Sequence, residues 1–197
     1  MSRFCGPAAR SAGFNDGFIL EISNQLEVIQ NSPNRSELET QVVKCFEGLE
    51  SWKPNEQDEA ELELHAELWV KLARLAANED SPKLLKYSLR CAEKALVQSR
   101  AADPNAIPSN RLRWYSLAEF LSSESLLKLV NPKTQEAGSV EGLLLLSLAR
   151  GVEAASKGFR CGINVLVLDA GKQVWNVCAR LQESRANRAK LLQPVRS

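Results

Sequence analysis

Few side chains in this sequence are of the types that carry out chemistry. The chain has one histidine, His65, so it cannot place a cluster of imidazoles around a metal, and it offers a single imidazole base. A lone histidine near the start of a surface helix is usually solvated, and we expect this for His65. Gly158 and Gly162 flank a connection but lack the Lys-Ser/Thr pair of a phosphate-binding loop. We therefore assign no catalytic, cofactor-binding or metal-binding residue, expect no cofactor, and predict that the chain is not an enzyme.

The five cysteines are scattered along the chain, and no Cys-x-x-Cys pair occurs. An odd, dispersed set in a chain whose first residues lack the apolar segment of a signal peptide indicates reduced, intracellular thiols. Arginines and small residues in the same N-terminal stretch leave a mitochondrial presequence as the alternative. Three cysteines stand in or beside apolar helix faces, where packing explains them better than reactivity: Cys91, Cys161 and Cys178.

Two charged stretches could bind a partner. Residues 56–67 are rich in carboxylates, which would suit a cation or a basic partner, but acidic side chains also favour the start of a helix. We prefer the second reading, because no calcium-loop pattern accompanies them. The tail from 180 onward is basic, and its candidate partner-binding residues for an acidic protein tail or RNA are Arg185, Arg188 and Lys190. We prefer the other reading, a helix C-terminus that favours cations followed by a frayed end, and the lack of interleaved aromatic residues makes nucleic acid unlikely.

The composition is that of an all-α protein. The chain has 197 residues, 44% of them hydrophobic and 25% charged, with a net charge of +1. This content is globular, and the balanced charge gives no global field for nucleic acid or a membrane surface. The apolar run 143–148 is far too short to span a bilayer.

The stretch 66–95 predicts two antiparallel helices that are folded on each other. Leu68, Trp69 and Leu72 recur at helical spacing in the first helix. Ser81 is a good N-cap, and Pro82 at the first helical position loses no hydrogen bond. Helices joined by so few residues must be antiparallel. Small residues would let their axes approach closely: Ala76, Ser88, Ala92 and Ala95.

The same patterns predict about seven helices in a chain with flexible or basic ends. We expect a flexible N-terminus at 1–15, hairpins at about 16–52, 60–102 and 110–158, a single helix at 163–183, and a basic tail at 184–197. In the third hairpin, the second helix should end at Gly158 as its C′ residue and should bury Leu144, Leu148, Val152 and Ala155. Because the last helix has no predicted partner helix, we expect the chain to be a piece of a longer solenoid, such as a short isoform, or this helix to be a cap.

Three of the helices carry a repeating signature of a large residue, then x-x-Leu/Ala-small. It occurs at Leu72-x-x-Leu75-Ala76, at Trp114-x-x-Leu117-Ala118-x-x-Leu121 and at Val167-x-x-Ala170-Gly171-x-x-Val174. These matches resemble the first helix of the tetratricopeptide repeat, a helix–turn–helix unit of about 34 residues. The sequence therefore predicts a degenerate, tetratricopeptide-like solenoid of stacked helical hairpins.

The closing segment LVLDAGKQVWNVCARLQESRANRAKLLQPV is similar to segments of the large cilia- and flagella-associated tetratricopeptide-repeat proteins. The similarity lies in a small-residue helix leading to Trp175-Asn176, an arginine-bearing turn and a Leu-Leu-x-Pro ending. It implies a structural subunit of the axonemal central-pair apparatus, located in the cytoplasm, the cytoskeleton and the cilium axoneme. Its partners would be other central-apparatus proteins, and its role would be support of cilium movement.

Protein–protein binding is thus the expected function. Candidate groove residues are Trp69, Trp114 and Tyr115, although we expect at least half of them to pack in the core. A cytoplasmic helical-repeat adaptor that binds a peptide or partner helix is the alternative, and a small α-helical enzyme or regulatory subunit is a third reading. A deep polar pocket around His65 would favour the enzyme, whereas a smooth helical groove would favour the scaffold. We expect no small-molecule substrate and no membrane partner.

Overall fold

The computed structural model describes residues 15–31, 35–101 and 106–182, and all of its regular structure is helical. This confirms the predicted all-α class and the predicted seven helices. The expected flexible N-terminus, apart from Asn15, and the basic tail lie outside the described residues. The helices are α1 (Asn15–Asn31), α2 (Arg35–Ser51), α3 (Glu59–Ala77), α4 (Pro82–Ala101), α5 (Ser109–Leu129), α6 (Ala137–Arg160) and α7 (Asn164–Gln182).

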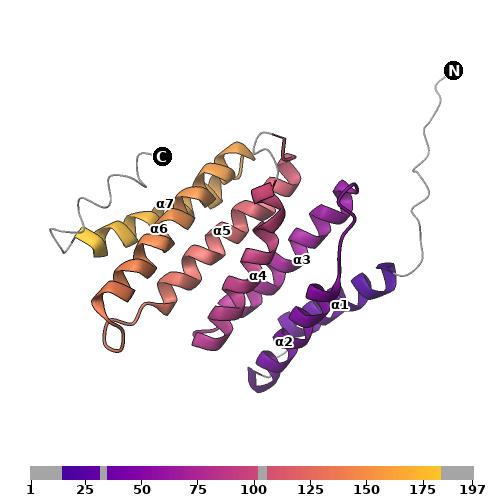
Figure 1. The fold of residues 1–197 in the computed structure, drawn as a ribbon, viewed down its shortest axis with the longest axis horizontal. Helices are drawn as coiled ribbons and strands as arrows, with labels where there is room; N and C mark the ends of the chain where they lie inside the picture. The colour runs from indigo at the N-terminus through magenta and orange to yellow at the C-terminus, as the bar shows by residue number, and fades with distance from the viewer. Residues whose placement is uncertain (1–14, 32–34, 102–105, 183–197) are drawn as a thin grey trace.

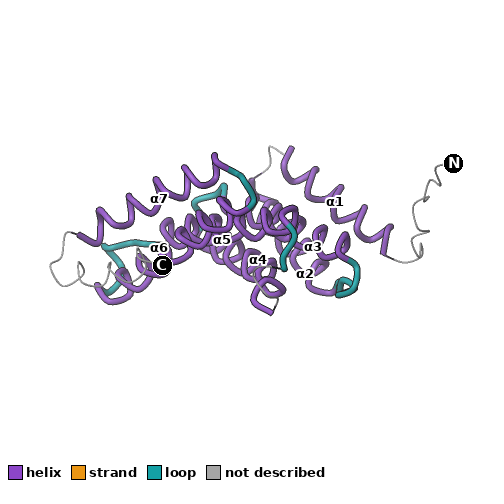
Figure 2. Tube along the Cα trace, turned by 90° about the horizontal axis from the view of Figure 1, so that it is seen from above, coloured by secondary structure: helices purple, strands orange, loops and turns teal. Residues whose placement is uncertain are grey.

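The helices are stacked in chain order, as in a helical-repeat protein. Each helix packs against the next one along the chain, and the molecule extends from α1 and α2 at one end to α6 and α7 at the other (Figure 1). Helices separated by one other helix in the chain are also in contact. Helix α3 packs against both α1 and α5, and α7 packs against α5. The odd-numbered helices therefore form one layer, with α1 and α7 on the opposite side of the molecule from α2 (Figure 2).

The central hairpin forms as its sequence predicts. Helix α4 begins at Pro82, and the carbonyl of Ser81 accepts the first helical hydrogen bond from the amide of Leu85 at 2.9 Å. All four predicted small residues are buried, and this allows the close approach of the two axes. Helix α3 starts after Asp58, whose carboxylate accepts hydrogen bonds from the amides of Ala60 and Glu61. The acidic stretch thus supplies the N-cap and first turn of α3, as we expected.

Helix α5 lies at the centre of the stack. It packs against α3, α4, α6 and α7, so most of its circumference is buried, including polar side chains such as Ser116, Ser123 and Glu119. Buried polar groups need partners, and α6 provides several of them. Ser116 Oγ donates to the carbonyl of Ala154 at 2.7 Å, and the Ser123 and Ser147 hydroxyls each donate to the other's backbone carbonyl.

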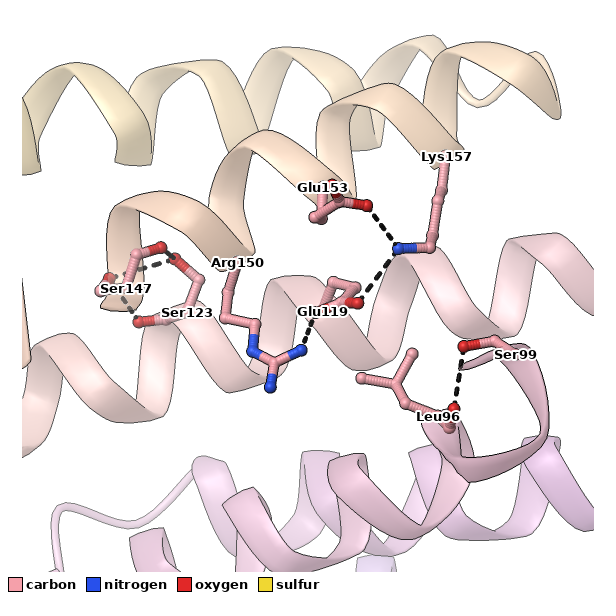
Figure 3. A network of polar contacts seen from close by, with 8 residues as sticks. All are labelled: Leu96, Ser99, Glu119, Ser123, Ser147, Arg150, Glu153 and Lys157. Atoms are coloured by element: carbon pink, nitrogen blue, oxygen red, sulfur yellow. Dashed lines mark hydrogen bonds and ion pairs between the residues drawn. The ribbon is translucent and has the colours of Figure 1, made fainter. Parts of the chain in front are cut away.

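A buried ion-pair cluster accompanies these hydroxyls. The carboxylate of Glu119 on α5 contacts Arg150 at 2.9 Å and Lys157 at 3.1 Å, and both bases come from α6 (Figure 3). Lys157 also pairs with Glu153 at 2.7 Å. Small and polar residues therefore occupy the middle of the α5–α6 interface. The buried apolar residues form two separate clusters, one from α1 to α5 and the loops between them and one from α6 and α7.

The structure corrects the predicted inward face of α6. Leu144 and Leu148 are buried as expected, but Val152 and Ala155 are half-buried. The buried face instead continues through Gly151, Ala154 and Gly158. The reason is close packing, because a Cβ at Gly151 would lie 2.9 Å from Val174 Cγ2, and one at Gly158 would lie 3.2 Å from Ser116 Oγ.

Gly158 is therefore an interior helix residue and not the predicted C′ residue. Helix α6 continues to Arg160, and Gly162, with φ of 74°, occupies the left-handed C′ position. The amide of Ile163 donates to the carbonyl of Gly158, and the amide of Gly162 donates to that of Phe159. This pair of bonds is the Schellman motif, which ends the helix and turns the chain into α7.

The third repeat match also differs from the other two. The small residues Ala76 and Ala118 are buried at helix crossings, whereas Gly171 is exposed and a Cβ there would meet nothing within 4 Å. Helix α7 packs through Ala170 and through Leu166, Gln173, Val177 and Leu181. Helix α7 therefore matches the repeat signature in its residue types, but the matched small residue does not occupy the same packing position as in α3 and α5.

Candidate protein-binding surface

The three aromatic residues proposed for partner contact are mostly core residues. Trp69 and Tyr115 are only 1% and 0% exposed, respectively, so neither can reach a partner in this structure. Trp114 is half-buried, and the guanidinium of Arg113 lies 4.5 Å from its ring centroid. Only Trp114 of this trio is a surface candidate. The proposed tail residues Arg185, Arg188 and Lys190 lie outside the described residues.

The structure brings together a different set of residues in a groove between α1 and α3. The groove has a volume of about 460 Å³. Its floor includes the buried leucines Leu26 and Leu68. The carboxylate of Glu27 and the bases of Lys71 and Arg74 line it as well. The remaining lining residues are Ser23, Gln30, Leu75 and Asn78.

Helical periodicity places these groups on one face. Ser23, Leu26, Glu27 and Gln30 are spaced three and four residues apart along α1, so they share one side of that helix. The α3 residues repeat in the same way from Leu68 through Lys71 to Leu75. The apolar floor can bind an apolar side chain of another polypeptide, and the charged side chains at its edges can pair with polar residues next to that side chain. We call this site the α1–α3 groove.

A second groove lies between α1 and α2. It has a volume of about 590 Å³ and is lined on α1 by residues from Gly17 to Ile29, among them Leu20, Glu21 and Val28. Leu20 and Val28 are 62% and 63% exposed, which is unusual for large aliphatic side chains. Helix α2 contributes Gln41, Lys44 and Cys45. We call this site the α1–α2 groove.

His65 is not the solvated side chain that the sequence led us to expect. It is half-buried, its Nε2 accepts a hydrogen bond from Trp69 Nε1 at 3.0 Å, and its ring lies 5.1 Å from that of Trp52. Burial is the largest cause that lowers the pKa of His65 to about 4. The imidazole is therefore neutral at pH 7, but its acceptor nitrogen is already hydrogen-bonded to Trp69. His65 is therefore a poor candidate for a general base. Neither groove is lined by His65.

The cysteines that the structure describes are free thiols. Cys45 and Cys91 are buried, and burial raises the pKa of Cys45 to about 11 and that of Cys91 further still. Such thiols are protonated and unreactive at neutral pH. In the described ranges, no three histidine, cysteine or acidic side chains are close enough to hold a metal ion.

Part of the acidic stretch is used inside the fold. Glu59 pairs with Arg111 Nε at 3.2 Å, and Glu63 accepts a hydrogen bond from the Asn110 amide, so the start of α3 contacts the start of α5. Sequence reasoning gave two uses for these acids, a helix start and a partner site, and the structure adds an internal contact.

Comparison with known proteins gives no match to a family model, to a curated protein or to a solved structure. Among the described helices, none is both long and apolar enough to cross a bilayer.

Sequence reasoning missed the groove residues because their pattern is ordinary. Leucines three or four residues from charged side chains occur on every amphipathic helix of the chain. A weak signal exists in Lys71 and Arg74, which stand three apart on one face of α3, but only the packing of α1 beside α3 makes a site of them.

Proposed function

We propose that this chain is a structural scaffold that binds partner proteins, and that the α1–α3 groove is its docking site. The observation that carries the proposal is the groove itself, where buried leucines lie between Glu27 on one helix and Lys71 and Arg74 on the other. The matching partner is an amphipathic helix or extended peptide with apolar anchor residues and at least one acidic side chain beside the two bases.

The resemblance of the C-terminal third to cilia- and flagella-associated tetratricopeptide-repeat proteins gives the proposed setting. In that setting the scaffold is a subunit of the axonemal central apparatus that supports cilium movement. Stacked hairpins suit this role, because an extended surface sums many weak contacts over a large area.

Localisation with a groove variant tests both parts of the proposal. The tagged chain is expressed in multiciliated cells, which are then extracted with detergent to separate the axoneme from soluble protein. We expect retention along the axoneme for the unmodified chain, and loss of retention for the double variant Lys71→Glu, Arg74→Glu. Lys86→Glu is a matched control, because Lys86 is an exposed base on α4 and lines neither groove.

Each outcome separates the hypotheses. Full extraction of the unmodified chain would exclude an axonemal role and leave the cytoplasmic adaptor as the second candidate. Equal retention of the chain and its groove variant would show that another surface docks. The enzyme reading has less support, because the two grooves are lined without His65 and its acceptor nitrogen is bonded to Trp69.

A further inference from the structure

The exposed large apolar side chains are concentrated at the two ends of the stack. Among the described residues, eight such side chains are exposed, and five of them lie on α1 or α7: Leu20, Val28, Val165, Leu168 and Trp175. Helices α1 and α7 lie at opposite ends of the molecule (Figure 1). A monomeric protein rarely exposes apolar residues together unless the surface is used.

On α7 these residues form a ridge. Leu168 and Trp175 are seven residues apart and share one face of the helix, with exposed fractions of 64% and 72%. Gly171 lies between them on that face, and a Cβ there would have nothing within 4 Å. The indole of Trp175 therefore stands beside a low point in the ridge, which leaves room for an approaching helix.

At the other end, the α1–α2 groove can receive such a ridge. The exposed Leu20 and Val28 line it together with the buried Ile29 and Cys45, which makes much of its wall apolar. Gln41 also lines the groove, and its Oε1 is buried without a hydrogen-bond donor from the described residues. An indole N–H needs an acceptor when it is buried, and a turn of the Gln41 side chain toward the groove would supply one to an entering tryptophan.

The charges of the two ends are complementary. Helices α1 and α2 together contain seven acidic and two basic residues, whereas α7, which carries the ridge, contains one acidic and two basic residues. A negative end facing a positive end gives attraction and fixes orientation.

We infer that the chain associates head to tail with a second copy of itself, with the α7 ridge of one copy in the α1–α2 groove of the next. This contact is heterologous, so each added copy leaves the same two ends free and the assembly grows as a linear stack. The stack continues the helical repeat across copies, because a repeat unit buries its apolar face only against a neighbour. The surface is separate from Lys71 and Arg74, and the inference does not depend on the proposed docking function.

Sedimentation velocity over a range of protein concentrations tests the inference. We expect the average mass of the unmodified chain to rise with concentration past that of a dimer, and to fall when salt is added, because the attraction is partly electrostatic. Trp175→Glu places a carboxylate against the acidic end, and Leu20→Lys places an amine against the basic end. Each should weaken self-association about tenfold or more, as the loss of a central anchor does.

Mixing the two variants gives the decisive result. The Trp175→Glu chain keeps an intact groove and the Leu20→Lys chain keeps an intact ridge, so the two should form a one-to-one complex at a concentration where each alone is monomeric. Val97→Lys is the control, because Val97 is 57% exposed on α4, away from both ends, and this variant should associate normally. Both test residues are exposed, and circular dichroism verifies that each variant is folded.

Three results would overturn the inference. A monomeric unmodified chain at every concentration would show that the ends do not meet, as would happen if another segment of the same chain covers the ridge. Self-association that survives in Leu20→Lys but not in Trp175→Glu would indicate α7–α7 pairing. A mixture that remains monomeric would exclude the head-to-tail contact.

Discussion

His65 shows how a single side chain becomes part of the framework of this protein. Its ring packs against Trp52, its Nε2 accepts the indole N–H of Trp69, and Trp69 in turn packs edge-on against Phe46 with centroids 5.2 Å apart. The neutral imidazole is required for this arrangement, because a protonated ring carries N–H groups on both nitrogens and cannot accept the hydrogen bond.

The free energy of unfolding should therefore fall in mild acid. The folded pKa of His65, about 4, lies below the ordinary value of 6.5 that applies to the unfolded chain. The contribution is complete above pH 6.5 and is lost as the pH falls toward 4, since only the unfolded state binds the proton in this window. We expect a loss of about 2 kcal/mol, after discounting for the partial exposure of the ring.

Urea unfolding of the protein and of His65→Gln at several pH values would measure this loss. Glutamine keeps an acceptor for Trp69 but does not titrate, so the difference between the two proteins isolates the imidazole from the carboxylates that titrate in the same range. An equal slope of stability against pH in both proteins would show that His65 is exposed to solvent.

Two glycines of α6 should respond in opposite ways to the same substitution. Gly151→Ala would place a Cβ 2.9 Å from Val174 Cγ2 and 3.3 Å from Ser123 Oγ, and a valine is stiff at χ1. We expect this change to destabilise the protein by about 1–3 kcal/mol. Gly142→Ala meets nothing within 4 Å and should stabilise the helix by about 0.5–1 kcal/mol.

Thermal or urea unfolding of the two variants would check this pair. Since both substitutions are in one helix, both gain a similar amount of helix propensity. The difference between their free energies of unfolding therefore measures how closely α5 and α7 approach α6 at Gly151. A stabilising Gly151→Ala would mean that α7 does not pack as closely as described.

At the scale of elements, the α5–α6 interface is held by charge and hydroxyl contacts where an ordinary repeat would use apolar ones. Glu119 is the centre of this contact, since its side chain is only 6% exposed and it faces Arg150 and Lys157 from the neighbouring helix. Removing one partner from a buried pair is costly because the remaining charges keep their desolvation penalty.

Glu119→Gln is expected to destabilise the domain by about 1–3 kcal/mol, because Arg150 loses its carboxylate while it remains largely buried. Glu153→Gln is the matched control in the same cluster. The Glu153 side chain is 58% exposed, so its loss should cost less than about 1 kcal/mol. The midpoint of guanidinium or urea unfolding measures both, and equal effects would contradict a buried role for Glu119.

At the scale of the whole molecule, stability should be graded from the centre to the ends. Helix α5 packs against four neighbours, whereas the end helices α1 and α7 each pack against two among the described elements. In a stacked architecture, units with fewer neighbours open at lower free energy.

Amide hydrogen exchange should therefore be slowest in α5 and faster in α1 and α7, the helices at the two ends. At high protein concentration, head-to-tail association would slow exchange in α1 and α7 together, since each end is covered by the other. Protection that is uniform along the chain, at a concentration where the protein is monomeric, would indicate a single cooperative unit instead.

The sequence by itself determined the helices and most of their limits. Helical spacing of apolar residues, the Ser81-Pro82 start and the acidic first turn of α3 act within one or two turns of the chain, so they can be read without knowing the fold. Close packing of small residues in the α3–α4 hairpin was predictable for the same reason, because the short connection forces those two helices together.

Only the tertiary structure decided what lies on each surface. Gly158 reads as a helix end in the sequence, but α6 continues past it to Arg160, and Ser116 of α5 packs closely against it. His65 reads as solvated, but the end of α2 brings Trp52 against it. The α1–α3 groove joins Leu26 to Leu68, which belong to different hairpins. In each of these contacts the partner comes from outside the residue's own helix, and local periodicity does not tell which other element will pack there.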